Sequence, residues 1–238
     1  MDFRTKGFAV KAFTLTEQIN PSAELSAVHQ AIEAGQRPGE ILRQNLAGPI
    51  DIATVLACRG LESNGGQGLP LQTGKPIDEQ ARPFLVASFW ETLLPGARQT
   101  AILNLSAGLL QIYDFWEESH AAAQRADDLG EHRLSAQWHA ICHRREPDAG
   151  NANYWWARVG KNPLADALTN LIDKSMADQP PCIQTLASRL LERGQYSDRA
   201  MVSHSLAVKP LSDEAKFLRL IQKFEMLLLF DLTLDQLT

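Results

Sequence analysis

The stretch 132-HRLSAQWHAICHRREPDAGNANYWWARVG-160 contains two helical segments separated by a short turn. Apolar residues recur with helical spacing in the first segment, residues 132–146. The residues 147-PDAG-150 are typical of a turn. The second segment, residues 151–159, is followed by Gly160, a residue that commonly terminates helices. The stretch therefore predicts an antiparallel helix hairpin at 132–160.

Helical patterns continue on both sides of this hairpin. Further helices are predicted at 23–35, 39–48, 80–93, about 99–126, 164–175, 182–193 and 213–231. Residues 7–15 fit a short strand or an extended arm, and residues 50–62 are apolar enough for either type, although their length favours a helix. Alternating strand patterns are otherwise absent from the sequence. The fold class predicted is all-α, a compact multi-helix domain.

A Gly- and Pro-rich stretch at 63–78 is the clearest loop in the chain. We take it as part of an N-terminal, mainly helical portion, residues 1–100, laid against a helical core domain, residues 101–238. The loop is either a hinge or a long surface excursion. It has no Gly-Lys-Ser/Thr sequence, so its glycines do not form a phosphate-binding motif.

Composition excludes several classes of partner. With 45% apolar and 21% charged residues, the chain has the balance of a soluble globular protein, and its net charge of -5 argues against nucleic-acid and anionic-membrane partners. The longest apolar run, 226-MLLLF-230, is too short to span a bilayer. Three scattered cysteines do not form a disulfide framework. We expect a cytoplasmic protein and leave a homo-oligomer open.

The segment 111-QIYDFWEESHAAAQ-124 is amphipathic, but polar residues interrupt its apolar face. At about 100° per residue, three of them fall on the apolar side: Glu117, His120 and Gln124. Asp114 and Glu118 fall outside it, as solvent-facing charges should. A buried carboxylate needs a partner, because burying it alone costs several kcal/mol. Glu117 and His120 are therefore candidate site residues on a buried face.

Two more helices bring ionisable groups to the core. In residues 132–146 the apolar stripe consists of Leu134, Trp138, Ile141 and Cys142. His139, His143 and Glu146 gather along one border of this stripe, whereas Arg133, Gln137 and Arg144 point the other way. Arg145 falls among the apolar residues, where it either extends to solvent or pairs with a buried carboxylate. In residues 216–231, Glu225 lies within apolar surroundings.

Glu-x-x-His and His-x-x-x-His spacings place ligands on one side of a helix, as zinc and non-haem iron sites do. The sequence therefore predicts a pocket lined by Glu117, His120, His139, His143 and Glu225. The candidate metal ligands are His120, His139 and His143, and the candidate ions are zinc, iron and manganese. The candidate catalytic residues are Glu117, Glu225 and Arg145. Without a metal, a histidine paired with a carboxylate would serve in acid–base chemistry near neutral pH.

This pattern favours an enzyme that acts on a small molecule, of unspecified reaction. The alternative is a tetratricopeptide-like helical module that binds a peptide or protein and has no catalytic activity. For Glu117 and Glu225 the alternative to a site role is a buried ion pair with Arg145 or Arg158 that fixes the helix register. The enzyme predicts histidines that converge on one another and on a carboxylate. The module predicts exposed aromatic residues and histidines that do not converge.

The run 138-WHAICHRREPDAGNANYWWARVGKNP-163 resembles a signature of a family of largely uncharacterised, all-helical bacterial proteins. Glu118-Ser119-His120 upstream, and Gln222, Glu225 and Leu229-Phe230-Asp231 downstream, resemble further parts of its pattern, so that the resemblance covers roughly residues 106–238. Gln137 stands where the family has Tyr, and Met226 where it often has Trp. The resemblance implies that the histidines belong to a site, without naming a reaction.

Overall fold

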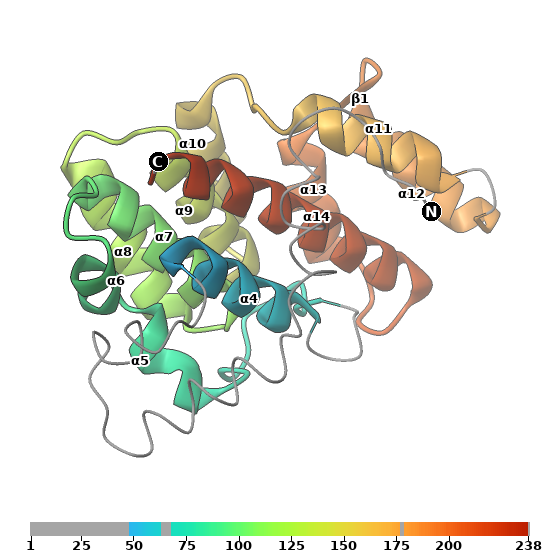
Figure 1. The fold of residues 1–238 in the computed structure, drawn as a ribbon. Helices are drawn as coiled ribbons and strands as arrows, with labels where there is room; N and C mark the ends of the chain where they lie inside the picture. Colours follow the sequence, from blue (N-terminus) through green and yellow to red (C-terminus); the bar gives the residue numbers. More distant parts are fainter. Residues whose placement is uncertain (1–47, 63–67, 177–178, 238) are drawn as a thin grey trace.

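The computed structural model describes residues 48–62, 68–176 and 179–237, and these are mostly α-helical (Figure 1). The first elements are α4 (Pro49–Glu62), the 3-10 helix η1 (Glu79–Ala81), α5 (Arg82–Leu85), α6 (Ala87–Leu93), α7 (Gln99–Ile112) and α8 (Trp116–Asp128). They are followed by α9 (Leu134–Arg145), α10 (Ala149–Val159), α11 (Ala165–Met176) and α12 (Pro181–Leu190). The last are β1 (Leu191–Glu192), β2 (Gln195–Tyr196), α13 (Asp198–Ala207) and α14 (Asp213–Asp235).

This architecture confirms the all-α fold class. The helices predicted at 23–35 and 39–48, and the strand or arm at 7–15, lie outside the described residues. None of the helices in the described ranges combines the length and the apolar character that a membrane span requires.

The predicted hairpin at 132–160 is formed by α9 and α10, which pack against each other. Asp148 begins α10, because its side chain accepts a hydrogen bond from the backbone N–H of Asn151 at 3.0 Å. Gly160 ends it with a φ of 72°, a conformation that glycine adopts without strain. Local sequence signals therefore set both ends of α10.

Helix α9 lies at the centre of the molecule, where α7, α8, α10, α13 and α14 all contact it. All 12 of its residues are buried, including Gln137 and Arg144. The amphipathic interpretation of this segment is therefore too simple, because a central helix faces protein on every side. The polar groups of α9 must find partners inside the molecule.

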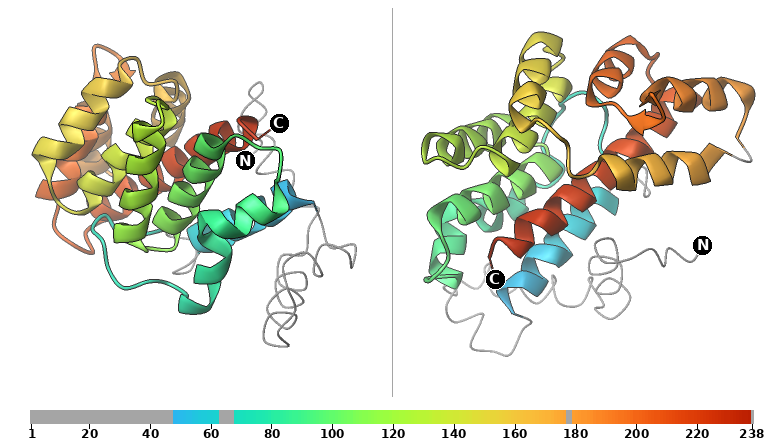
Figure 2. Two further views of the ribbon diagram at one scale, coloured as in Figure 1. Left: turned by 90° about the vertical axis from the view of Figure 1, so that its left-hand side faces the viewer. Right: turned by 90° about the horizontal axis from the view of Figure 1, so that it is seen from above.

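Helix α14 runs across the molecule, and α4 lies beside it (Figures 1 and 2). One continuous hydrophobic cluster extends from Ile52 in α4 to Leu234 in α14. The described part of residues 48–100 thus shares its core with residues 101–237. Helices α11 and α12 and the β1–β2 hairpin lie together at one end (Figure 1).

The single helix predicted at about 99–126 is in fact two helices, with a break at residues 113–115. Asp114 sits in the break with a φ of 66°, and it is buried rather than facing solvent as predicted. Its Oδ2 accepts a hydrogen bond from the Gly74 N–H at 2.9 Å, and its Oδ1 lies 3.0 Å from Nη2 of Arg145. Contacts with distant segments therefore stabilise this break.

Two elements near the C-terminus were not predicted. Helix α13 begins where the Ser197 side chain accepts from the N–H of Ala200. The β1–β2 hairpin ends the predicted helix 182–193 early, and its two turn residues, Arg193 and Gly194, have φ values of 54° and 78°. Two successive positive φ values are typical of the tight turns that join antiparallel strands.

Candidate functional site

Three histidines from two helices converge at the α8–α9 contact. His139 and His143 lie one turn apart on α9, and their rings are nearly parallel, with centroids 5.0 Å apart. His120 approaches from α8, with its ring almost perpendicular to theirs at 4.3 Å from His139 and 5.0 Å from His143. One ligand nitrogen from each residue lies within 4.8 Å of the other two. The predicted convergence of His120, His139 and His143 is therefore confirmed.

Glu146 fixes the orientation of one of these rings. Glu146 follows His143 by one helical turn, and its Oε2 lies 2.8 Å from Nδ1 of His143. In the neutral tautomer that donates Nδ1–H to this carboxylate, Nε2 of His143 keeps a lone pair. A carboxylate that binds the far side of a histidine ring in this way is characteristic of metal-binding histidines.

His139 is the most enclosed of the three. It is 1% exposed, and the Trp155 ring stacks on it at 3.9 Å between centroids. Burial, followed by the neighbouring His120 and His143, lowers the pKa of His139 to about 3. Its Nδ1 is buried and has no hydrogen-bond partner among the described residues. A neutral imidazole with an unpartnered nitrogen is the form of histidine that binds a metal.

His120 lies at the outer edge of the cluster, where it is half-buried. Burial lowers its pKa, and the adjacent His143 lowers it further. Trp116, at the start of α8, lies 5.6 Å from it between ring centroids. Nε1 of Trp116 donates to the carbonyl of Cys142 on α9 at 3.0 Å, which holds the two helices together beside the histidines.

A second layer of contacts supports Trp155. The guanidinium of Arg158 lies 5.2 Å above the Trp155 ring, a cation–π contact, and it is held at 3.2 Å by Oδ2 of Asp127 on α8. The other oxygen of Asp127 lies 2.8 Å from Nδ1 of His132. Helices α8, α9 and α10 are thus tied together around the three histidines.

Glu117 does not join the cluster. It lies in the first turn of α8 and is exposed, so the prediction that it faces the core is wrong. The physical reason is the break at Asp114, because α8 begins anew at Trp116 and the helical phase carried over from α7 no longer applies. The carboxylate beside the histidines is that of Glu146.

Glu225 is buried, as predicted, but within a different network. Its two oxygens bind the guanidinium of Arg144, with one contact from Nη1 to Oε1 at 3.0 Å and another from Nη2 to Oε2. The hydroxyl of Tyr196 donates to Oε1 at 3.2 Å. Neither Arg145 nor Arg158 is its partner. Glu225 therefore serves a buried ion pair, and the predicted pocket that combined it with the histidines is not formed.

Arg145, the third candidate catalytic residue, is completely buried. Besides pairing with Asp114, it donates to the backbone carbonyls of Pro70, Gln72 and Gln111 at 3.3–3.4 Å. It thus links α9 to the loop before η1 and to the end of α7. Of the two alternatives predicted for it, the structure shows pairing with a buried carboxylate, and its contacts favour a structural role over a catalytic one.

Asp198 extends the network of Glu225. Its Oδ1 accepts from Nδ2 of Asn162 at 2.6 Å. Burial and the negative charge of Glu225 raise the pKa of Asp198 to about 7, whereas the Asn162 hydrogen bond and the charge of Arg144 lower it less. Tyr196 also contacts Glu225, and the pKa of its hydroxyl is raised well above its usual value by burial and by the two acids.

This arrangement predicts that Asp198 lowers stability as the pH rises. The folded chain keeps a proton that the unfolded chain loses near pH 4, so the stabilisation is complete below pH 4 and is lost as the pH rises to about 7. Asp198→Asn keeps the acceptor for Asn162 and removes the titration. We expect its gain in unfolding free energy to be larger at pH 8 than at pH 5 by roughly 2–3 kcal/mol. Urea unfolding of both proteins at the two pH values measures this, and an equal gain would contradict it.

Two residues in contact with the histidines, Glu146 and Trp155, were not among the predicted site residues. Glu146 is three residues after His143, a spacing that brings it to the same side of the helix, and its position on the stripe border was visible. Trp155 carried no comparable signal, because a tryptophan in a hairpin is most simply part of the core.

No known family model, curated protein or solved structure matches this chain.

Proposed function

We propose that this protein binds a divalent transition-metal ion through His120, His139 and His143 and uses it in a reaction on a small molecule. The observation that carries the proposal is the convergence of three imidazoles, with their ligand nitrogens within 4.8 Å of one another. Two supporting observations are the carboxylate of Glu146 behind His143 and the unpartnered Nδ1 of His139.

The donor set favours zinc, with iron and manganese as the alternatives. Ligand nitrogens around tetrahedral zinc are about 3.4 Å apart, so zinc would draw the three nitrogens closer together than the 4.8 Å within which they lie. Three imidazoles without a carboxylate ligand suit zinc better than manganese, which prefers oxygen ligands. Three protein ligands leave a coordination position for water or substrate, and zinc held in this way would supply Lewis-acid chemistry.

The alternative of a tetratricopeptide-like interaction module has less support. The α9–α10 hairpin and the exposed ring of Tyr154 fit it. However, such a module has no need for three converging histidines, one of them with a buried and unpartnered nitrogen. The contacts of the histidines therefore favour a metal site.

We also propose that the protein works in a reducing, cytoplasmic setting without nucleic-acid partners. Cys142 and Cys182 form no disulfide with another described residue, and burial raises the pKa of Cys142 to about 12, which keeps it protonated and unreactive. The net charge of -5 supports the absence of a nucleic-acid partner.

Metal content tests the proposed function. We expect about one zinc ion per purified, untagged chain, measured by elemental mass spectrometry after dialysis. His120→Ala is the decisive variant, because His120 is half-buried and its removal leaves the core intact. Its zinc affinity should fall at least about 100-fold, since a ligand contributes more than a group that orients one. Glu146→Ala should cost about 10- to 100-fold, because His143 loses its partner.

His204→Ala is the matched control, since His204 is also half-buried and lies on α13. It should retain full metal content. The proposal would be refuted by a chain that binds neither zinc, iron nor manganese, or by a His120→Ala variant that binds zinc like the parent. Circular dichroism of each variant confirms that the fold is retained.

A further inference from the structure

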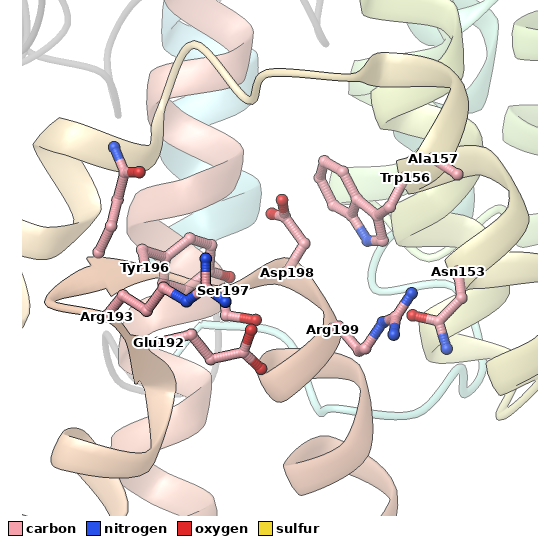
Figure 3. Close-up of a pocket in the computed structure, with 10 residues that line it drawn as sticks. Asn153, Trp156, Ala157, Glu192, Arg193, Tyr196, Ser197, Asp198 and Arg199 are labelled. Atoms are coloured by element: carbon pink, nitrogen blue, oxygen red, sulfur yellow. The ribbon is translucent and has the colours of Figure 1, made fainter.

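A second site lies on another side of α10, where a pocket of about 440 Å³ opens between α10, the β1–β2 hairpin and the start of α13 (Figure 3). Its volume is in the range of small-molecule sites. Asn153, Trp156 and Ala157 line it from α10, at the spacing of one helix face. The histidine cluster contributes none of its residues, so the pocket is independent of the proposed metal site.

Asp198 supplies a negative charge at the inner wall of this pocket. In Figure 3 its carboxylate points into the space in front of Trp156. Asp198 also interacts electrostatically with the Glu225 carboxylate, which is already paired with Arg144. One buried cation thus serves two carboxylates, and the pKa of Asp198 is raised first by burial and then by the negative charge of Glu225. A cationic group bound in the pocket would stabilise the ionised form of Asp198.

Trp156 forms the opposite wall. It is 6% exposed, and its ring lies across a space from Asp198 (Figure 3). Its Nε1 is buried and finds no acceptor in the part of the chain that the structure describes. An aromatic ring opposite a carboxylate is a favourable setting for an ammonium group, because the ring face also attracts cations.

The mouth of the pocket carries charges of the other sign. Arg193 and Arg199 are exposed there, and neither forms an ion pair with another described residue. Arg199 extends toward Asn153 in Figure 3, so that a guanidinium and an amide point to the same region. Both groups donate hydrogen bonds, and together they suit a carboxylate.

We propose that this pocket binds a free amino acid, with its ammonium group against Asp198 and Trp156 and its carboxylate against Arg199 and Asn153. The ammonium group is complementary to Asp198 and the carboxylate to Arg199, and both of these residues line the pocket. Glu192, which is exposed at the rim, would disfavour a purely anionic ligand, and the arginines would disfavour a purely cationic one.

Calorimetric titration of the full chain at pH 8 with each of the twenty proteinogenic amino acids tests the proposal. At least one should bind with a Kd below about 1 mM. For that amino acid, its N-acetyl derivative and its methyl ester should each bind at least about tenfold more weakly, since each lacks one charge. Asp198→Asn and Arg199→Gln should each weaken binding of the amino acid by at least about tenfold.

Asp173→Asn and Arg125→Gln are the matched controls, because both residues are exposed on other helices. They should leave the affinity unchanged. The proposal is overturned if no amino acid binds at up to about 10 mM, or if Arg199→Gln and Asp198→Asn bind as the parent does. Arg199 is exposed, so its variant tests the site without endangering the fold. Removal of metal from the histidine cluster should not alter the affinity, which separates this test from that of the proposed function.

Discussion

Replacing Glu225 with glutamine is expected to lower the free energy of unfolding by about 3–5 kcal/mol. The side chains of Arg144 and Glu225 are both 0% exposed, and the carboxylate binds the guanidinium through both of its oxygens. Glutamine is nearly the same size, so the variant creates no cavity. It leaves a buried guanidinium that cannot lose its charge and whose side-chain hydrogen-bond acceptors are now neutral, the introduced amide oxygen and that of Gln222 at 3.4 Å. Urea unfolding monitored by circular dichroism measures the loss.

The double variant Arg144→Met, Glu225→Leu separates the cost of an unpaired charge from the value of the pair. It should be within about 2 kcal/mol of the parent, because apolar residues of similar volume commonly replace a buried ion pair without loss. Glu91→Gln, at an exposed position on α6, is the control for the chemical change itself. A loss below about 1 kcal/mol for Glu225→Gln would show that this pair is not held in a dry interior.

How far the sequence predicts this protein depends on the range of the interactions involved. Helix-forming patterns and end signals such as Asp148 and Gly160 are local, and they predicted the α9–α10 hairpin correctly. The convergence of His139 with His143 follows from helical spacing alone. Their approach to His120 was predicted because both segments, 111–124 and 132–146, carry polar residues on the side expected to face the core.

The errors arise where distant residues decide the outcome. Arg144 and Arg145 are neighbours in the sequence, yet they pair with different acids. Arg144 binds Glu225, which is 81 positions away, and Arg145 binds Asp114 in the break between α7 and α8. No local pattern assigns these partners. The break at Asp114 then displaced Glu117 from the predicted face, because a helical wheel is valid only while the helix is continuous. Two long-range ion pairs thus lie at the two wrong placements: Arg145–Asp114 at the break before Glu117, and Arg144–Glu225 away from the histidines.

Replacing Asp114 with asparagine is therefore expected to be as damaging as the loss of Glu225, at about 3–5 kcal/mol of unfolding free energy. Asparagine tolerates the φ of 66° and can still accept from the Gly74 N–H. The variant therefore isolates the effect of removing the negative charge that is paired with Arg145. Because Asp114 lies in the break directly before α8, which carries His120, we expect the zinc affinity to fall together with the stability. Thermal unfolding and zinc titration measure the two effects, with Asp173→Asn as the exposed control. An Asp114→Asn variant as stable as this control would show that the backbone contacts of Arg145, rather than its charge partner, maintain the break between α7 and α8.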